Sequence, residues 1–188
     1  MPLLSKYLTY ARLSQVQKFL GKRVLDVGSG CGELLDFLPP HVESVVFLDR
    51  NAERLPKLKA RLSKSTIQGE FLQGDIGEQV IQLAPESFDT IVMAALLEHL
   101  RSPDWAVKQA QRLLRPGGQL VITTPTPLGG KLHWLGSLFG LTYREAAQEH
   151  ERFFGYLSLK ALLRRNGFKL ERYERFLVNL NQLVVARK

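Results

Sequence analysis

The chain has 188 residues, of which 45% are hydrophobic and 23% are charged, and its net charge is +8. This balance predicts a single globular domain over residues 1–188 and excludes a disordered or collagen-like chain. No apolar run approaches the ~20 residues of a membrane span, and the only cysteine, Cys31, suits a reducing compartment, so we expect a cytoplasmic protein without a transmembrane segment.

Residues 1–20 are expected to supply an N-terminal helix, beginning near Tyr7, that leads into the first strand. Residues 24–27 are apolar and rich in β-branched side chains, which predicts a short buried strand around Asp26. Alternating glycines follow at positions 28, 30 and 32, and residues 33–38 predict a helix. A strand, a glycine loop and a helix in succession are typical of the places where nucleotide-like cofactors bind in α/β sheets.

The spacing of the glycines separates two kinds of cofactor. A dinucleotide fingerprint would place its third glycine at position 33, where this chain has Glu33, and this disfavours a nicotinamide oxidoreductase. The alternative is a turn between strand and helix that binds no ligand. Cys31 is interpreted as a small residue in this tight turn rather than as a nucleophile.

Strands and helices then alternate along the chain. A second strand ends in an acid at Asp49, and Asn51 can cap a helix in which Pro56 indicates a kink or a later start. In chain order the expected elements are strand 44–49, helix 51–63, strand 70–73, short helix 77–83, strand 88–94, a helix from Ser102 to about residue 114, and strand 119–124. This alternation predicts a parallel, doubly wound sheet with helices on both faces.

The last third of the chain departs from this pattern. A helix over residues 158–166, closed by Gly167, precedes two strands at 168–177 and 181–187 that a tight turn through Asn179 would join. Such a hairpin adds an antiparallel pair. We therefore expect a seven-stranded mixed sheet.

The segment 125–149 is long for a connection, and connections of this length are usually functional. Its apolar residues form two helical stripes, so the segment needs contacts on two sides. It is expected to cover an acceptor site. Plain packing and a peripheral membrane contact are the alternatives.

Basic residues gather at 50–64 and again at 160–175. Such runs can attract phosphates, but no RNA-binding motif accompanies them. A solvated helix face is the favoured interpretation, and nucleic acid is kept as the less favoured partner.

Taken together, the chain resembles the class I S-adenosylmethionine (SAM) dependent methyltransferases of the type 11 or type 12 group. The resemblance extends from about residue 20 to the end. It rests on these pieces, in this order: residues 24–32, Asp49, Gly74–Asp75, Phe88–Asp89 with Glu98–His99, residues 114–118, and the closing segment 150–168, which ends Arg-Asn-Gly-Phe. The family's sheet has the order 3-2-1-4-5-7-6 with strand 7 antiparallel, and the same order is expected here.

The resemblance implies a set of cofactor-binding residues. Gly28 and Gly30 would approach the methionine part of SAM, and Asp26 would fix the loop or reach the amino group through water. Asp49, 21 residues after the first glycine, would hold the ribose hydroxyls. The remaining implied contacts are Arg50 and Ile76 with adenine, Asp75 with its amino group, and the Ala94 carbonyl with the methionine ammonium.

Each acid also has a local explanation, because Asp49 can cap a helix and Asp75 can stabilise a turn. Three acids at three successive strand ends favour the ligand instead. If the acceptor is a hydroxyl, a general base is expected, and His99 and His150 lead His133 as candidates. No metal is expected.

The predicted function is methyl transfer from SAM, with S-adenosylhomocysteine as product, to a small-molecule, lipid-linked or sugar-linked acceptor. An RNA methyltransferase and a non-catalytic SAM-binding regulatory module are the alternatives. The alternative of an RNA methyltransferase is less favoured because an Asn-Pro-Pro-Tyr type motif is missing after the fourth strand. Residues 94–97 are Ala-Ala-Leu-Leu instead.

Overall fold

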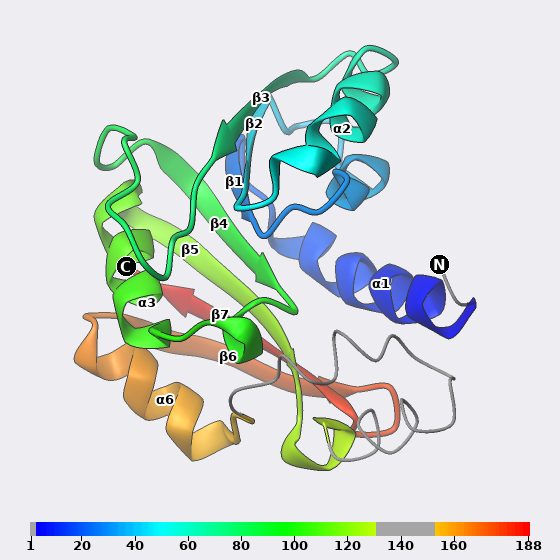
Figure 1. The fold of residues 1–188 in the computed structure, drawn as a ribbon. Coiled ribbons are helices and arrows are strands. Elements are labelled where there is room, and N and C mark those ends of the chain that lie inside the picture. The colour runs from blue at the N-terminus through cyan, green and yellow to red at the C-terminus, as the bar shows by residue number, and fades with distance from the viewer. Residues whose placement is uncertain (1–2, 131–152) are drawn as a thin grey trace.

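A mixed sheet of seven strands forms the centre of the molecule in a computed structural model that describes residues 3–130 and 153–188 (Figure 1). The strands are β1 Arg23–Val27, β2 Ser44–Asp49, β3 Gln68–Gln73, β4 Phe88–Ala94, β5 Leu114–Pro125, β6 Lys169–Phe176 and β7 Asn181–Arg187. The α-helices are α1 Leu3–Val16, α2 Leu55–Leu62, α3 Pro103–Leu113 and α6 Tyr156–Arg165. Short 3-10 helices cover Gln17–Phe19, Glu33–Phe37, Ala52–Arg54 and Leu97–His99.

The strand order is β3-β2-β1-β4-β5-β7-β6, and β7 runs antiparallel to both of its neighbours. The pairs β1–β2, β1–β4, β2–β3 and β4–β5 are parallel. The predicted order and direction are therefore confirmed. Because parallel strands end on the same edge, Asp26, Asp49 and Ala94 are brought to one side of the sheet.

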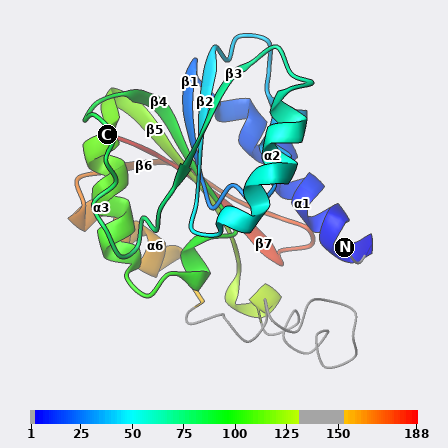
Figure 2. The ribbon, with the colours of Figure 1, turned by 45° about the horizontal axis from the view of Figure 1, so that its top comes forward.

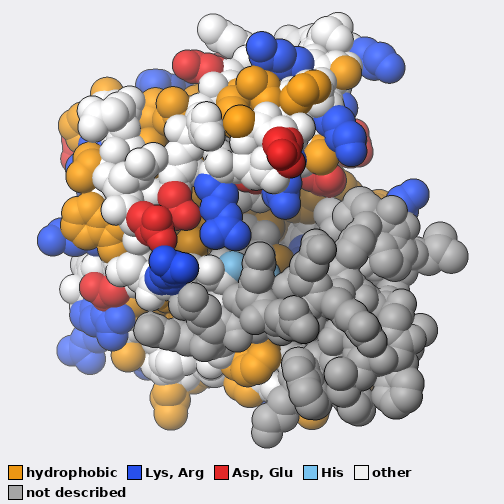
Figure 3. Space-filling model, viewed as in Figure 1, with side chains coloured by type: hydrophobic (Ala, Val, Ile, Leu, Met, Phe, Trp, Pro, Cys, Tyr) orange, Lys and Arg blue, Asp and Glu red, His pale blue; other side chains and the backbone are white. Residues whose placement is uncertain are grey.

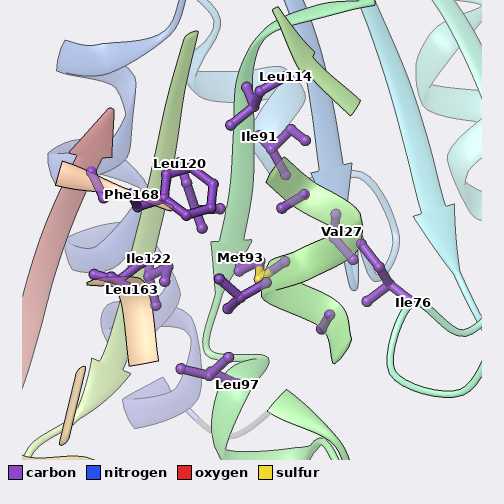
Figure 4. Close-up of a cluster of buried hydrophobic side chains, with 14 of the residues drawn as sticks. Val27, Ile76, Ile91, Met93, Leu97, Leu114, Leu120, Ile122, Leu163 and Phe168 are labelled. Atoms are coloured by element: carbon purple, nitrogen blue, oxygen red, sulfur yellow. The ribbon is translucent and has the colours of Figure 1, made fainter. Parts of the chain in front are cut away.

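Helices cover both faces of the sheet, as predicted, with α1 and α2 on one side and α3 and α6 on the other (Figure 2). One core cluster joins α3 and α6 to the sheet through side chains such as Ile91, Leu120 and Leu163 (Figure 4). A second cluster packs α1 and α2 on the opposite face through Leu13, Leu58 and Phe47. Burial on both faces explains the largely apolar sequences of the central strands β1, β2 and β4, whereas the edge strands β3 and β6 are more exposed and more polar.

Several elements differ from prediction in type or bounds. The expected helix at 33–38 is a 3-10 helix that ends at Phe37, because Pro39 disfavours helical backbone at the residue before it. The expected helix at 51–63 is divided into a 3-10 turn and α2. The α-helix begins later, with Pro56 in its first turn, where a missing N–H costs nothing.

The short helix predicted at 77–83 is wrong, since these residues form turns and irregular backbone. A single turn does form, because Asp75 accepts from the Gly77 amide through its side chain and from the Gln79 amide through its carbonyl. Arg112 on α3 then binds the Ile81 and Leu83 carbonyls at 2.7 and 2.9 Å. These hydrogen bonds hold the segment in a non-helical conformation, and the side chain of Ile81 is buried in the core.

Most of the predicted covering segment 125–149 lies outside the described residues, as do His133 and His150. The C-terminal hairpin matches prediction closely, with Asn179 at a φ of 63° in its turn and Gly167 at 81° after α6. Within the described residues, no helix has the length and apolar character needed to cross a membrane.

Candidate functional site

The glycine loop after β1 lies against the end of β2. The backbone amides of Gly28 and Ser29 donate to the Leu48 carbonyl at 2.7 and 3.2 Å. Gly28 has a φ of 71°, and a Cβ there would lie 2.8 Å from the Leu96 side chain. Glycine is thus required at this position both by backbone conformation and by the close approach of the segment after β4.

Asp49 at the end of β2 organises the loop. Its Oδ2 accepts from the Gly30 amide at 2.8 Å and from Arg54 Nη1 at 3.1 Å, and its Oδ1 accepts from the Asn51 amide at 2.9 Å. The carboxylate is only 5% exposed. It therefore links the glycine loop to the 3-10 helix that precedes α2.

A cavity of about 710 Å³ opens at this edge of the sheet, between the ends of β1, β2 and β4, the loop after β3, and α1. Figure 3 shows charged side chains of both signs on this face of the molecule. All eight residues that the family resemblance implied line the cavity: Asp26, Gly28, Gly30, Asp49, Arg50, Asp75, Ile76 and Ala94. The structure therefore brings the predicted set together.

Asp26 lies at the floor of the cavity and is 4% exposed. Burial, which strips a charged carboxylate of its hydration, and the nearby acids Glu33 and Asp49 together raise its pKa to about 8. A cation bound in the cavity would oppose this shift. The floor is thus suited to a ligand with a positive group.

Asp75 and Ile76 line the cavity from the loop after β3. Asp75 Oδ1 accepts from the Gly77 amide at 2.8 Å, which confirms a local turn role. The same residue lines the cavity, so the turn and the ligand interpretations are compatible.

His99 lines the cavity from the short helix that follows β4. This helix is positioned by Ala95, whose amide donates to the Thr123 carbonyl at 2.8 Å, and by buried Glu98, which accepts from Thr124 Oγ1 at 2.9 Å. Of the histidine candidates, His99 is the one that the described residues place at the cavity.

Several lining residues escaped sequence reasoning. Thr9, Arg12 and Leu13 come from α1, and Arg54 and Glu33 come from the helices beside the glycine loop. Arg12 is partly buried, its Nε donates to Asn181 Oδ1 at 3.0 Å, and desolvation lowers its pKa while nearby Glu98 raises it. Glu33 Oε2 accepts from the Cys31 amide at 3.0 Å. The α1 residues lie in no motif, whereas the proximity of Glu33 and Arg54 to the loop was an available signal.

Comparisons with known proteins agree with this architecture. A family model described as a methyltransferase domain matches residues 4–173. The ubiquinone biosynthesis O-methyltransferase of Klebsiella pneumoniae strain 342 is 33% identical over 123 residues, which are 65% of this chain and 50% of that protein. The corresponding protein of Escherichia coli O7:K1 is 32% identical over the same length. The chain spans about half the length of these relatives.

Solved structures extend the likeness to nearly the whole chain. A SAM-dependent methyltransferase from Mesorhizobium loti superposes with a TM-score of 0.74 at 19% identity, covering 96% of this chain and 98% of that one. One from Methanosarcina mazei gives 0.69 at 19% identity, covering 93% and 96%. Since the family model spans most of the chain and the fold is shared throughout, the chain belongs to the class I SAM-dependent methyltransferases.

Proposed function

We propose that the chain binds SAM in this cavity and transfers its methyl group to a hydroxyl of a small molecule. The observation that supports this most is the convergence of Asp26, Asp49 and Asp75, from three successive strand ends, on one cavity. A volume of about 710 Å³ is within the range of small-molecule sites. The O-methyltransferase relatives support an oxygen nucleophile.

The donor and acceptor groups of the cavity fit such a ligand. Asp49 presents a carboxylate to accept from ribose hydroxyls, and Asp75 can accept from the adenine amino group. Ser29 Oγ is buried at the loop and has no hydrogen-bond partner among the described residues, so a polar ligand would satisfy it. Glu33 provides negative charge near the ammonium end, and the ammonium, once bound, would favour the ionised form of Asp26.

SAM, when bound, supplies a methyl group already activated on a sulfonium. The protein then has to position the acceptor, exclude water and receive the hydroxyl proton. His99 lies at the cavity after β4, and we assign it the role of general base. The lipid-linked and sugar-linked acceptors named above remain within this proposal as larger versions of the same substrate class.

Asp49→Ala tests the cofactor assignment. We expect SAM affinity, measured by calorimetry, to fall at least tenfold, because the ribose loses a charged acceptor. Asp49→Asn keeps the side-chain volume in case the alanine variant unfolds. Asp36→Ala is the control, since Asp36 is exposed, pairs with Arg61 and lies outside the cavity lining. Unchanged affinity in both Asp49 variants would refute the assignment.

The acceptor is tested by an assay coupled to release of S-adenosylhomocysteine, with lipid, quinol, glycan and RNA fractions offered in turn. Turnover with the quinol fraction would support the proposal. Turnover with RNA alone would replace the acceptor class. SAM binding without turnover of any fraction would favour a regulatory SAM-binding module.

A further inference from the structure

The Asp49 carboxylate is nearly saturated with donors. A carboxylate offers about four acceptor positions. The Gly30 amide, the Asn51 amide and Arg54 Nη1 occupy three of them, at 2.8, 2.9 and 3.1 Å. A ribose diol brings two hydroxyl donors and therefore needs one more position than remains.

Arg54 is the donor that can leave. The two amides belong to backbone that the glycine loop and the start of α2 hold in place, whereas Arg54 is a side chain that is 47% exposed. Its guanidinium also lies over the loop, because a Cβ built on Gly30 would be 3.9 Å from Arg54 Nη1. Arg54 and Asp49 both line the cavity, so this ion pair lies at the place where a ligand would bind.

We propose that Arg54 competes with the ribose of the nucleoside for Asp49, so that the ligand displaces the guanidinium as it binds. This inference rests on the proposed function. Arg54 can return its exposed guanidinium to solvent, and the ribose hydroxyls replace it as donors to the buried carboxylate, so Asp49 is not left unpaired and the backbone need not rearrange. Arg54 is then a determinant of nucleoside affinity that opposes binding, although it lies in the binding site.

The competition predicts a gain of affinity when Arg54 is removed. Arg54→Met should bind adenosine about twofold to fivefold more tightly than the wild type in calorimetry, because the diol no longer has to displace a cation. Adenosine is neutral, so a change in the charge of the cavity alone has little effect on it. Lys59→Gln is the control, since Lys59 is an exposed cation on α2 outside the cavity lining.

A second probe separates competition from a general change of shape. For 2′,3′-dideoxyadenosine, which has no diol, Arg54→Met and the wild type should bind equally. Raising the ionic strength to about 1 M, where the screening length is ~3 Å, should tighten adenosine binding to the wild type more than to Arg54→Met. Thermal melts of each variant establish that it is folded.

Some outcomes would overturn only the role of Arg54, and others would refute the proposed function itself. Weaker or unchanged adenosine binding by folded Arg54→Met overturns the competition, as does an equal gain for the dideoxy probe. Failure of the wild type to bind SAM, S-adenosylhomocysteine and adenosine would refute the proposed function itself, and with it the inference. Binding of SAM with no Arg54 effect refutes the inference alone.

Discussion

The carboxyl group of Asp26 is buried at a position where its ionisation is energetically unfavourable. Burial and the neighbouring acids raise its pKa from 3.8 to about 8, so the folded protein keeps a proton that the unfolded chain releases above pH 4. The folded state therefore binds more protons between these values, and its stability falls as the pH rises from about 4 to about 8.

Asp26→Asn should remove this dependence. Between pH 4 and 8, the free energy of unfolding of the wild type should fall with pH more steeply than that of the variant, by up to about 1.4 kcal/mol per pH unit. At pH 8 the variant should therefore have the higher free energy of unfolding. Urea unfolding across the pH range measures it. Asp104→Asn is the control, because hydrogen bonds from Asn166 and Arg165 lower the Asp104 pKa and move its titration below this range. Parallel curves for wild type and Asp26→Asn would contradict the expected result.

The residues that sequence reasoning located correctly at the cavity are those that follow strand ends. Asp49 and Asp75 could be found because an apolar run stops at an acid, and parallel strands bring such ends together. Thr9 and Arg12 could not be assigned, because their place in the cavity depends on how α1 packs on the sheet. Tertiary packing of this kind leaves no local pattern.

At the scale of elements, the loop after β1 is built around Gly32. This residue has a φ of 78° and precedes the 3-10 helix, and a Cβ there would lie 2.3 Å from the Leu58 side chain of α2. The glycine therefore serves two purposes, since it allows a left-handed backbone and it lets the loop contact α2. Gly117 has nearly the same φ, 76°, but a Cβ there would meet nothing within 4 Å.

Alanine substitutions at Gly32 and Gly117 separate the cost of backbone strain from the cost of steric contact with Leu58. Gly117→Ala should destabilise the protein by about 1–2 kcal/mol through backbone strain alone. Gly32→Ala should cost about 1–3 kcal/mol more, because the new methyl group also displaces Leu58. Urea unfolding of both variants gives the difference. Equal losses would show that α2 yields to the methyl group without penalty.

The wrong helix prediction at 77–83 shows that tertiary contacts can decide whether a short segment forms a helix. The segment is short, and isolated helices of this length are unstable in water. Arg112, 31 residues after Ile81, uses its guanidinium to bind carbonyls that a helix would have used internally. The central strands β1, β2 and β4 were predicted more reliably, because burial on both faces demands apolar runs that appear in the sequence itself.

At the scale of the molecule, α1 joins the first part of the chain to the last. Arg12 on α1 donates to Asn181 at the start of β7, 169 residues later. Leu13 lines the cavity and also belongs to the core cluster that covers this face of the sheet. The helix is therefore part of the core as well as part of the site wall, and we expect it to unfold with the sheet rather than separately.

Leu13→Ala tests this expectation. Leu13 is 5% exposed, so its truncation should lower the free energy of unfolding by about 2–4 kcal/mol, whereas Tyr7→Ala on the same helix, where Tyr7 is 59% exposed, should change it by less than about 0.5 kcal/mol. Hydrogen exchange then shows which backbone amides lose protection in the Leu13→Ala variant. If α1 and the sheet unfold together, amides in α3, on the opposite face, lose protection in Leu13→Ala by the same free energy as amides in α1. Protection lost in α1 alone would mean that the helix opens independently, and that access to the cavity is controlled by α1 rather than by the fold as a whole.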